Sequence, residues 1–244
     1  MIFAAGLGTR LKPLTDTMPK ALVSVGGRTL LEHTVRRLKA AGADRIVINV
    51  HHFAGQITDF LRRNNNFGVD IRVSDETGGL LETGGGIKKA APLFDPSQPI
   101  LIHNVDILSN ADLEAVCRDN ASNAATLLVS ERQTRRYLLF DADMRLVGWT
   151  NIDTGEVRSP FPESVTRHAR RYAFSGIHIF SPGLFPLFDS FPDKFGIIDF
   201  YLRVCDKVVI KGCVCTGLRL MDVGKADTLC HAEAFVKDIP YYAE

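Results

Sequence analysis

The sequence predicts an α/β protein with a Rossmann-like, mixed and mostly parallel sheet, helices on both faces, and a small antiparallel excursion. Short apolar runs alternate with stretches whose apolar residues recur at helical spacing, which is typical of strand–helix–strand units. A glycine-rich turn follows the first apolar run, and aspartates end two later runs, as in open α/β sheets. A chain of 244 residues is long enough to bury a sizeable core.

The first half of the chain is expected to alternate regularly between strands and helices. After the opening strand and its glycine turn, Leu31, Val35 and Leu38 mark the apolar face of a helix over 29–41. Gly42 is a suitable residue to end this helix, because glycine adopts the left-handed conformation without strain. The other expected elements are strand 45–50, helix 54–63, strand 69–73, a glycine-rich loop over 81–86, short helix 87–90, strand 100–103, helix 111–120 and strand 124–129.

The pattern changes after about residue 130, where apolar runs become shorter and turn residues separate them. These short runs predict the antiparallel excursion. Beyond it the expected elements are regular again. The predicted strands and helices are strands 137–140, 145–149 and 174–180, helices 182–188 and 198–205, strands 208–215 and 218–222, and a terminal helix over 225–235. The whole chain, 1–244, is therefore expected to form a single domain.

Composition excludes several classes of partner. The 29 basic and 28 acidic residues give a net charge of +1 with no basic stripe, so no nucleic acid is expected. No run of 18 apolar residues predicts a membrane span. The opening strand follows Met1 without a basic segment or cleavage site, which favours a cytoplasmic protein. The cysteines are expected to be buried, reduced thiols: Cys117, Cys205, Cys213, Cys215 and Cys230.

The N-terminal loop is the most informative part of the chain. Glycines at the end of a strand, Gly6 and Gly8, let backbone N–H groups converge on a phosphate. Arg10 and Lys20 then add positive charge around a polyphosphate. The loop is not a P-loop, because no Lys-Ser/Thr pair follows the glycines. It is not a dinucleotide fingerprint either, because Leu11 stands at the position of the third small residue.

Two aspartates at strand ends predict a metal site. Asp106 follows the apolar strand expected at 100–103, and Asp222 ends the strand at 218–222. Mg²⁺ in nucleotide sites commonly binds one or two carboxylates together with substrate phosphates. An aspartate at such a position can also cap a helix. Their occurrence together with the phosphate loop favours Asp106 and Asp222 as Mg²⁺ ligands.

The longer N-terminal string resembles the signature of the sugar-1-phosphate nucleotidylyltransferases, or NDP-sugar pyrophosphorylases. The string comprises residues 4–10 with Pro13-Leu14-Thr15 and residues 19–22. Asn104-x-Asp106 and residues 222–224 resemble the family's two metal-binding segments. The stretch 81–87 is similar to that of N-acetylmuramate-1-phosphate uridylyltransferases and of their mannose-1-phosphate guanylyltransferase-like relatives.

The chain departs from the family pattern at two places. Val105 stands where many members carry glycine, and residues 149–153 lack the lysine of a Glu-Lys-Pro segment that meets the sugar phosphate in several members. The residue that binds the acceptor phosphate is therefore open. The candidates are Arg158, Arg167, Arg170 and Arg171.

The resemblance implies a Rossmann-like nucleotidyltransferase fold and a Mg²⁺-dependent reaction of an NTP with a sugar 1-phosphate, giving NDP-sugar and pyrophosphate. Residues 1–129 would form the nucleotide-binding half, and 130–235 the sugar-phosphate-binding half with the terminal helix. The oligomeric state, monomer or homodimer, is open. The catalytic residues would be Arg10, Lys20, Asp106 and Asp222. The nucleotide-binding residues would be Ala5, Gly6, Leu7, Gly8, Thr9, Arg10, Lys20, Glu76, Leu81, Gly84 and Gly85, and the sugar-phosphate-binding residues Glu82, Asn104, Asn151 and Gly176.

Glu76 is the expected reader of the base. An ionised carboxylate only accepts hydrogen bonds, so it favours the N–H donors of uracil or guanine, and hence UTP or GTP over ATP. Backbone groups of residues 81–86 are the alternative readers.

Two other functions remain open from the sequence. One is cytidylyl transfer to a phospho-alcohol such as phosphocholine, with Trp149 and Tyr172 around the amine. The other is a non-catalytic NDP-sugar sensor on the same fold. A sensor could dispense with the metal carboxylates or the loop cations, whereas this chain has both.

Overall fold

The computed structural model describes residues 1–243, and a mixed sheet forms its centre. The strands of this sheet are β1 Ile2–Phe3, β4 Arg45–Val50, β5 Asp70–Asp75, β6 Ile100–Asn104, β8 Ala125–Ser130, β9 Arg136–Phe140, β10 Leu146–Asn151, β11 Glu156–Arg158, β12 Arg170–Phe180 and β13 Ile210–Val214. Within the described residues, eight of them follow the order β11–β10–β9–β12–β6–β1–β4–β5, while β8 pairs with both β12 and β13.

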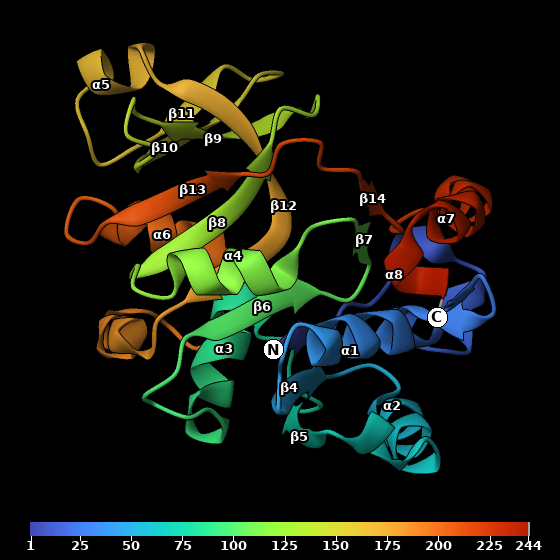
Figure 1. Ribbon diagram of the computed structural model, residues 1–244. Coiled ribbons are helices and arrows are strands. Elements are labelled where there is room, and N and C mark those ends of the chain that lie inside the picture. The colour runs from blue at the N-terminus through green and yellow to red at the C-terminus, as the bar shows by residue number, and fades with distance from the viewer. Residues whose placement is uncertain (244) are drawn as a thin grey trace.

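The sheet has a parallel part and an antiparallel part. Strand β1 pairs in parallel with β4 and β6, and β4 with β5. The long strand β12 pairs antiparallel with β9 near its start and with β6 near its end, so the predicted excursion continues the central sheet. Strands β9–β11 lie at one end of the molecule in Figure 1, and β4 and β5 lie at the other. The predicted mixed sheet with an antiparallel excursion is confirmed.

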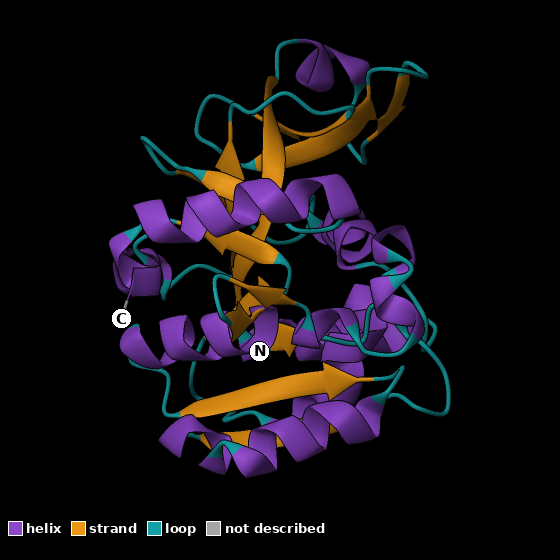
Figure 2. Ribbon diagram, turned by 90° about the vertical axis from the view of Figure 1, so that its right-hand side faces the viewer, coloured by secondary structure: helices purple, strands orange, loops and turns teal. Residues whose placement is uncertain are grey.

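Helices cover both faces of the sheet, as predicted (Figure 2). One apolar cluster joins the sheet to α1 Leu30–Ala40, α2 Ala54–Arg63, α4 Leu113–Asn120 and α7 Ala226–Asp238. A second cluster, rich in phenylalanine, joins it to α3 Glu82–Ala90, the 3₁₀ segment Pro182–Ser190 and α6 Ile197–Val204. Ile2 belongs to the first cluster and Met1 to the second, because successive strand residues point to opposite faces. The remaining short helices are α5 Glu163–Arg167 and α8 Pro240–Ala243.

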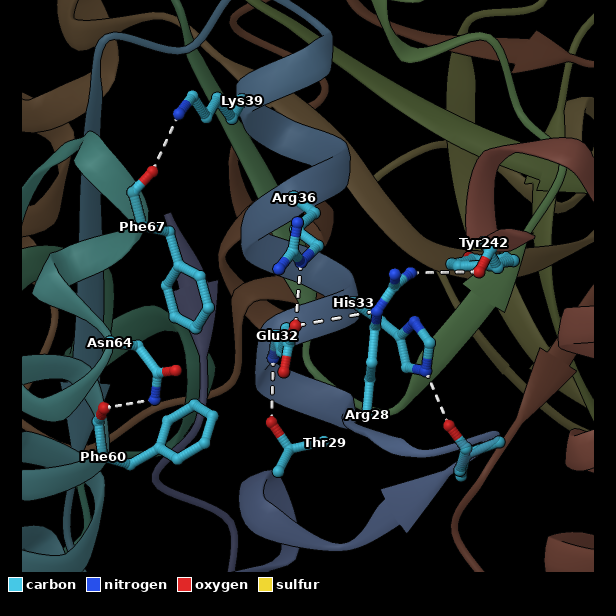
Figure 3. Close-up of polar contacts among 11 residues, drawn as sticks. Arg28, Thr29, Glu32, His33, Arg36, Lys39, Phe60, Asn64, Phe67 and Tyr242 are labelled. Carbon is cyan, nitrogen blue, oxygen red and sulfur yellow. Dashed lines mark hydrogen bonds and ion pairs between the residues drawn. The ribbon is translucent and has the colours of Figure 1, made fainter. Parts of the chain in front are cut away.

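Helix α1 is fixed at its start by local polar contacts (Figure 3). The Thr29 hydroxyl accepts a hydrogen bond from the Glu32 N–H at 3.1 Å, which caps the helix. The Glu32 carboxylate in turn accepts from Arg36, one turn further along, at 2.8 Å. The buried His33 ring donates to the Val25 carbonyl at 2.8 Å. These contacts join α1 to the hairpin of β2 Ser24–Val25 and β3 Arg28–Thr29.

A small separate sheet pairs β7 Ile107–Ser109 with β14 Leu220–Asp222. Arg37 of α1, which is buried, donates to the Ser109 carbonyl at 2.6 Å and to the Tyr242 hydroxyl at 3.1 Å. The same hydroxyl accepts from the Ser109 N–H at 2.9 Å. The C-terminal segment and α1 therefore hold β7 in place, and β7 holds the strand that ends at Asp222.

We expect Tyr242→Phe to lower the free energy of unfolding by about 1–2 kcal/mol, because the Ser109 N–H and Arg37 lose a buried acceptor. The midpoint of thermal unfolding should fall by roughly 2–8 °C. The matched control is Tyr241→Phe, since the Tyr241 side chain is 55% exposed. Equal melting temperatures for the two variants would show that this hydroxyl does not stabilise the fold.

Candidate active site

The N-terminal loop that follows β1 has backbone N–H groups without a protein acceptor among the described residues. The Ala4 N–H donates to Asn49 Oδ1 at 2.8 Å, which ties the loop to the end of β4. Gly8 has φ 63°, and its carbonyl accepts from the Leu11 N–H at 2.8 Å to start the 3₁₀ turn Thr9–Leu11. Among the described residues, no protein acceptor takes the N–H groups of residues 6–8. They are free to bind an anion, as the glycine pattern predicts.

Lys20 lies beneath this loop and pairs with Asp106. Its ammonium contacts the Asp106 carboxylate directly, and the residue is only 9% exposed. A Cβ built on Gly8 would lie 3.0 Å from Lys20 Cβ, so the loop packs on the stem of the lysine. The loop, the lysine and the first aspartate therefore form one unit.

The pairing of β7 with β14 brings the two predicted metal ligands together. Asp222 lies opposite Ile107, the residue after Asp106. The Val223 N–H also donates to the Asp106 carbonyl at 2.8 Å. Both aspartates are thus held by backbone contacts, and neither side chain is needed to cap a helix.

Arg10 completes this group of charges. A Cβ on Gly224 would lie 2.6 Å from Asp222 Oδ1 and 2.9 Å from Arg10 Nη2, so both side chains lie beside this glycine and a larger residue would displace them. Asp222 is exposed as a residue, and neighbouring protein atoms only partly bury its carboxyl group. Burial of the group and repulsion from Asp106 raise the pKa of Asp222, while Lys20 and Arg10 act in the opposite direction. The structure therefore gathers all four residues predicted to be catalytic.

A cleft of about 410 Å³ opens beside these charges, a size in the range of small-molecule sites. The predicted residues that line it are Ala5, Gly6, Lys20, Glu76, Glu82, Asn104 and Asp106. The others are Phe3, Ala4, Asn49, Leu80, Thr83 and Val105. Leu7, Gly8, Thr9 and Arg10 follow directly in the loop. Over the described chain, no group of three or more His, Cys, Asp or Glu residues could hold a metal. A cation here would depend on the aspartate pair.

Glu76 forms the floor of the cleft. It is fully buried, and its carboxylate accepts from Asn49 Nδ2 at 2.7 Å and from the Leu81 N–H at 3.2 Å. Asn49 thereby joins Glu76 to the N-terminal loop. Asn49 was not predicted as a site residue, although a polar residue within the apolar strand 45–50 was a usable signal. Base reading by Glu76 stays a prediction, and both of its oxygens already have protein donors.

The glycine-rich stretch is helical, so the loop expected over 81–86 is wrong. Helix α3 begins at Glu82, and a Cβ on Gly84 or Gly85 would lie 2.3 Å from the Phe195 ring or 2.0 Å from the Asp193 carbonyl oxygen. Both glycine N–H groups donate to the Phe195 carbonyl. These glycines permit close packing of α3 on a distant segment. The cleft is lined by Leu80, Glu82 and Thr83, and not by Leu81, Gly84 or Gly85.

The residues predicted to bind the sugar phosphate divide into two groups. Gly176 has φ 72°, and a Cβ there would lie 2.8 Å from Asn104 Nδ2, so these two residues are in contact near the cleft. Asn151 is not among the residues that line the cleft, and its side-chain oxygen accepts from the Asp153 N–H at 3.0 Å. This oxygen thus takes part in a turn, and binding of the sugar phosphate by Asn151 stays a prediction.

A second cavity of about 510 Å³ lies against the antiparallel part of the sheet. Arg158 pairs with Asp199 at 2.8 Å, and its guanidinium lies 4.7 Å from the centre of the Trp149 ring. A Cβ on Gly196 would lie 2.9 Å from Asp199 Oδ2 and 3.9 Å from Glu82 Oε2, so the two cavities adjoin. The lining residues are Arg132, Thr134, Arg136, Tyr137, Leu138, Trp149, Glu156, Arg158, Phe174, Ile198 and Asp199.

Of the four arginines considered for the acceptor phosphate, only Arg158 lines this second cavity. Arg167 pairs with Glu163 on α5, and Arg170 and Arg171 are exposed at the start of β12. Arg132 and Arg136 were not anticipated, because the cavity forms only when β9, β10 and β12 pair.

Comparison with known proteins identifies the family. The nucleotidyl transferase family model matches residues 1–239. The N-acetylmuramate alpha-1-phosphate uridylyltransferase of Neisseria meningitidis is 45% identical over 122 residues, which cover 50% of this chain and 52% of that protein. The enzyme of the same name from Caulobacter vibrioides is 46% identical over 108 residues, covering 43% and 44%. The chain thus spans about half the length of these relatives.

Solved structures share the fold over nearly the whole chain. The UDP-glucose pyrophosphorylase of Acinetobacter baumanii has a TM-score of 0.77 at 16% identity, covering 99% of this chain and 94% of that one. The inositol-1-phosphate CTP transferase of T. maritima has a TM-score of 0.74 at 15% identity, covering 97% and 95%. At these identities the likeness concerns the fold alone. No helix in the described part of the chain is long and apolar enough to cross a membrane.

Two glycines of the loop should respond differently to alanine. A Cβ on Gly6 meets nothing within 4 Å and points into open space, so Gly6→Ala should keep its melting temperature. Its KM for a nucleoside triphosphate should rise by roughly ten-fold, about 1.4 kcal/mol, because the methyl group obstructs the phosphates. Gly8→Ala should lower the melting temperature, because Gly8 has φ +63° and a Cβ on it would lie 2.9 Å from Thr15 Cγ2.

Thermal unfolding and initial rates over a range of nucleotide concentrations measure both effects. An unchanged KM in Gly6→Ala would mean that the phosphates do not pass over this residue.

Proposed function

Because the chain belongs to the nucleotidyl transferase family, we propose that it transfers a nucleoside monophosphate from an NTP to a sugar 1-phosphate. The products are an NDP-sugar and pyrophosphate. One observation carries the proposal: Arg10, Lys20, Asp106 and Asp222 meet at one edge of a cleft, beside a loop with open N–H groups. This arrangement matches the charge that develops on a nucleotide during transfer.

The reaction needs alignment and charge neutralisation rather than a general base. A phosphate monoester is largely a dianion at pH 7, so its oxygen attacks the α-phosphorus directly. The new P–O bond forms in line with the bond that breaks, and pyrophosphate leaves with that electron pair. The N–H groups of residues 6–8 would hold the leaving phosphates. Arg10 and Lys20 would neutralise the negative charge that develops on the phosphates during the transfer.

The two aspartates fit a divalent cation. Burial of its carboxyl group and the neighbouring charge of Asp106 raise the pKa of Asp222, and a bound cation would offset both effects. Carboxylate oxygens are suitable ligands for Mg²⁺, and the phosphates of a substrate would complete its shell. When bound, Mg²⁺ would supply charge stabilisation at the phosphate oxygens. Asp106 would then be shared between the metal and Lys20.

UTP is the proposed nucleotide, with GTP as the second choice. The two relatives at 45% and 46% identity are named uridylyltransferases. A mannose-1-phosphate guanyltransferase of Yarrowia lipolytica is 27% identical over 194 residues. Glu76 lines the cleft but already accepts hydrogen bonds from Asn49 and Leu81. Base selection would therefore involve the start of α3 as well as this carboxylate.

The second cavity favours an acceptor sugar that carries a negative charge beyond its phosphate. Among the residues that the structure describes, Arg132 and Arg136 form no ion pair, although Arg158 and Arg135 do. Unpaired arginines in a cavity suit a carboxylate, which they bind in a planar, bidentate manner. The Tyr137 ring beside them suits the face of a sugar. N-acetylmuramate has a lactyl carboxylate, which makes it the proposed acceptor class.

Transfer to phosphocholine is less consistent with this cavity. A quaternary amine needs an open aromatic face. The Trp149 ring is already covered by the Arg158 guanidinium at 4.7 Å, and Tyr172 is buried with its ring edge-on to Phe140. A non-catalytic sensor would not require Arg10 and Lys20 beside both aspartates.

Pyrophosphate release from a panel of NTPs and sugar 1-phosphates tests the proposed function. We expect UTP to be preferred, and kcat/KM for N-acetylmuramate 1-phosphate to exceed that for N-acetylglucosamine 1-phosphate by roughly ten-fold or more, about 1.4 kcal/mol for a charged contact. The two acceptors differ only in the lactyl group. Arg136→Gln should remove the preference, whereas Arg135→Gln, whose side chain is 82% exposed, should keep it.

No pyrophosphate release with any pair of substrates would refute the transferase. Equal use of the two acceptors would refute the acidic-acceptor proposal alone.

Asp222→Asn should abolish Mg²⁺-dependent turnover without unfolding the protein. The folded state raises the pKa of Asp222. Ionisation of this carboxyl group therefore lowers the free energy of unfolding as pH rises through the pKa of the folded state. The metal-free variant should therefore melt at the same temperature as wild type or higher at pH 7. Mg²⁺ with a nucleotide should raise the melting temperature of wild type and of the exposed control Asp206→Asn, but not that of Asp222→Asn. A normal Mg²⁺ response in Asp222→Asn would contradict its role as a ligand.

A further inference from the structure

Only one of the five cysteines is buried, so the expectation of buried thiols is confirmed for Cys205 alone. Cys230 is exposed, and the other three are half-buried: Cys117, Cys213 and Cys215. Cys213 and Cys215 are close in sequence, with one residue between them. We call these two residues the thiol pair. The proposed transfer reaction uses neither of them.

The thiol pair lies at the end of β13, with both side chains on the same face of the sheet. Cys213 lies opposite Leu128 of β8, and Cys215 directly follows the strand. Both residues pack against the first apolar cluster, whereas Val214 between them is 39% exposed. In the described part of the chain, β13 forms a ladder with β8 alone, so its other side is an edge of the sheet. The two thiols thus lie side by side and partly open to solvent at this edge.

The spacing of the two residues permits a disulfide. Residues two apart in an extended strand have Cα atoms about 6.6 Å apart, and disulfides span Cα separations up to about 6.8 Å. Cys215 lies where the strand gives way to a turn, because its carbonyl accepts from the Leu218 N–H at 3.2 Å. The two thiols are already in hydrogen-bond contact. A bond between their sulfur atoms is therefore within reach.

The surroundings favour the thiolate of Cys213. A hydrogen bond from the Cys215 thiol lowers the pKa of Cys213, and a second one from the Asn120 side chain acts in the same direction against burial and Asp119. The hydrogen bond with Cys213 also raises the pKa of Cys215. Asn120 is held at the end of α4, where its amide donates to the Val116 carbonyl at 2.9 Å. Cys213 is therefore the nucleophile of the pair, because the thiolate is the reactive form.

We propose that the thiol pair is a thiol–disulfide exchange site for small soluble disulfides, R–S–S–R. The Cys213 thiolate attacks one sulfur of R–S–S–R, so that a mixed disulfide forms and RS⁻ leaves and takes a proton from solvent. Cys215 then loses its proton to solvent and attacks the Cys213 sulfur. The disulfide between Cys213 and Cys215 forms, and a second RS⁻ leaves and is protonated. Two protein thiols are thereby oxidised, and one small disulfide is reduced to two thiols.

Treatment of the wild-type protein with 2-hydroxyethyl disulfide tests the exchange directly. Cleavage by trypsin after Lys211 and Arg219 places the thiol pair in one peptide, 212–219, and Cys230 in another. Peptide 212–219 should lose two hydrogen atoms in mass, whereas Cys230 should gain one hydroxyethylthio group. At pH 7 the pair should react roughly three-fold faster than Cys230 or more, although Cys230 is the more exposed, because the thiolate of Cys213 is favoured. Dithiothreitol should restore the free thiols.

Two variants at Cys215 separate its role as hydrogen-bond donor from its role as second sulfur. Cys215→Ser keeps a donor but has no second sulfur, so Cys213 should retain one hydroxyethylthio group. Cys215→Ala has no donor either, and Cys213 should react roughly three-fold more slowly than in Cys215→Ser. The matched control is Cys230→Ser, which should form the disulfide in peptide 212–219 at the wild-type rate.

A peptide 212–219 that stays reduced while Cys230 is blocked would overturn the proposal. Separate hydroxyethylthio groups on its two sulfur atoms would do the same. Equal rates at Cys213 in the two Cys215 variants would also contradict it, because Cys215 would then not activate Cys213. These measurements follow thiols and not turnover, so a failure of the proposed function leaves them interpretable.

Discussion

The candidate site depends on holding two like charges side by side. Asp106 and Asp222 repel each other, and burial of the carboxyl group together with that repulsion raises the pKa of Asp222. Side-chain contacts alone would let them separate. They stay together because Asp222 lies in a backbone pair with Ile107, and the Val223 N–H donates to the Asp106 carbonyl. Lys20 and Arg10 then supply compensating charge.

Much of the surrounding structure supports that small β7–β14 sheet. Arg37 reaches from α1 to the Ser109 carbonyl, and the Tyr242 hydroxyl binds Ser109 from the C-terminal segment. Helix α1 is itself fixed by the cap at Thr29 and by the contact of His33 with the preceding hairpin. The chain thus brings its C-terminal segment and its first long helix to the same strand. Residues far from the cleft thereby set the separation of the two carboxylates.

The sequence predicted those parts of the site that follow from local pattern. The glycine turn after β1 and the aspartates at strand ends were readable, because parallel strands present their carboxyl ends at one edge. The run at Gly84 was misread as a loop, because its packing partner, Phe195, is distant in sequence. The second cavity, lined by Arg132, was missed for a related reason, since strand pairing alone brings its walls together.

Glu82 lies where the two cavities adjoin, and its backbone conformation is strained. It has φ 62°, which for a non-glycine residue costs about 1–3 kcal/mol. The N–H groups of the next glycines hold this start of α3 against the Phe195 carbonyl, so the strain is sustained by packing. Its carboxylate lies near Gly196, where the cleft meets the second cavity. An ionised carboxylate only accepts hydrogen bonds, and it repels phosphate. At this junction it suits the hydroxyl groups of an acceptor sugar better than the phosphate of that sugar.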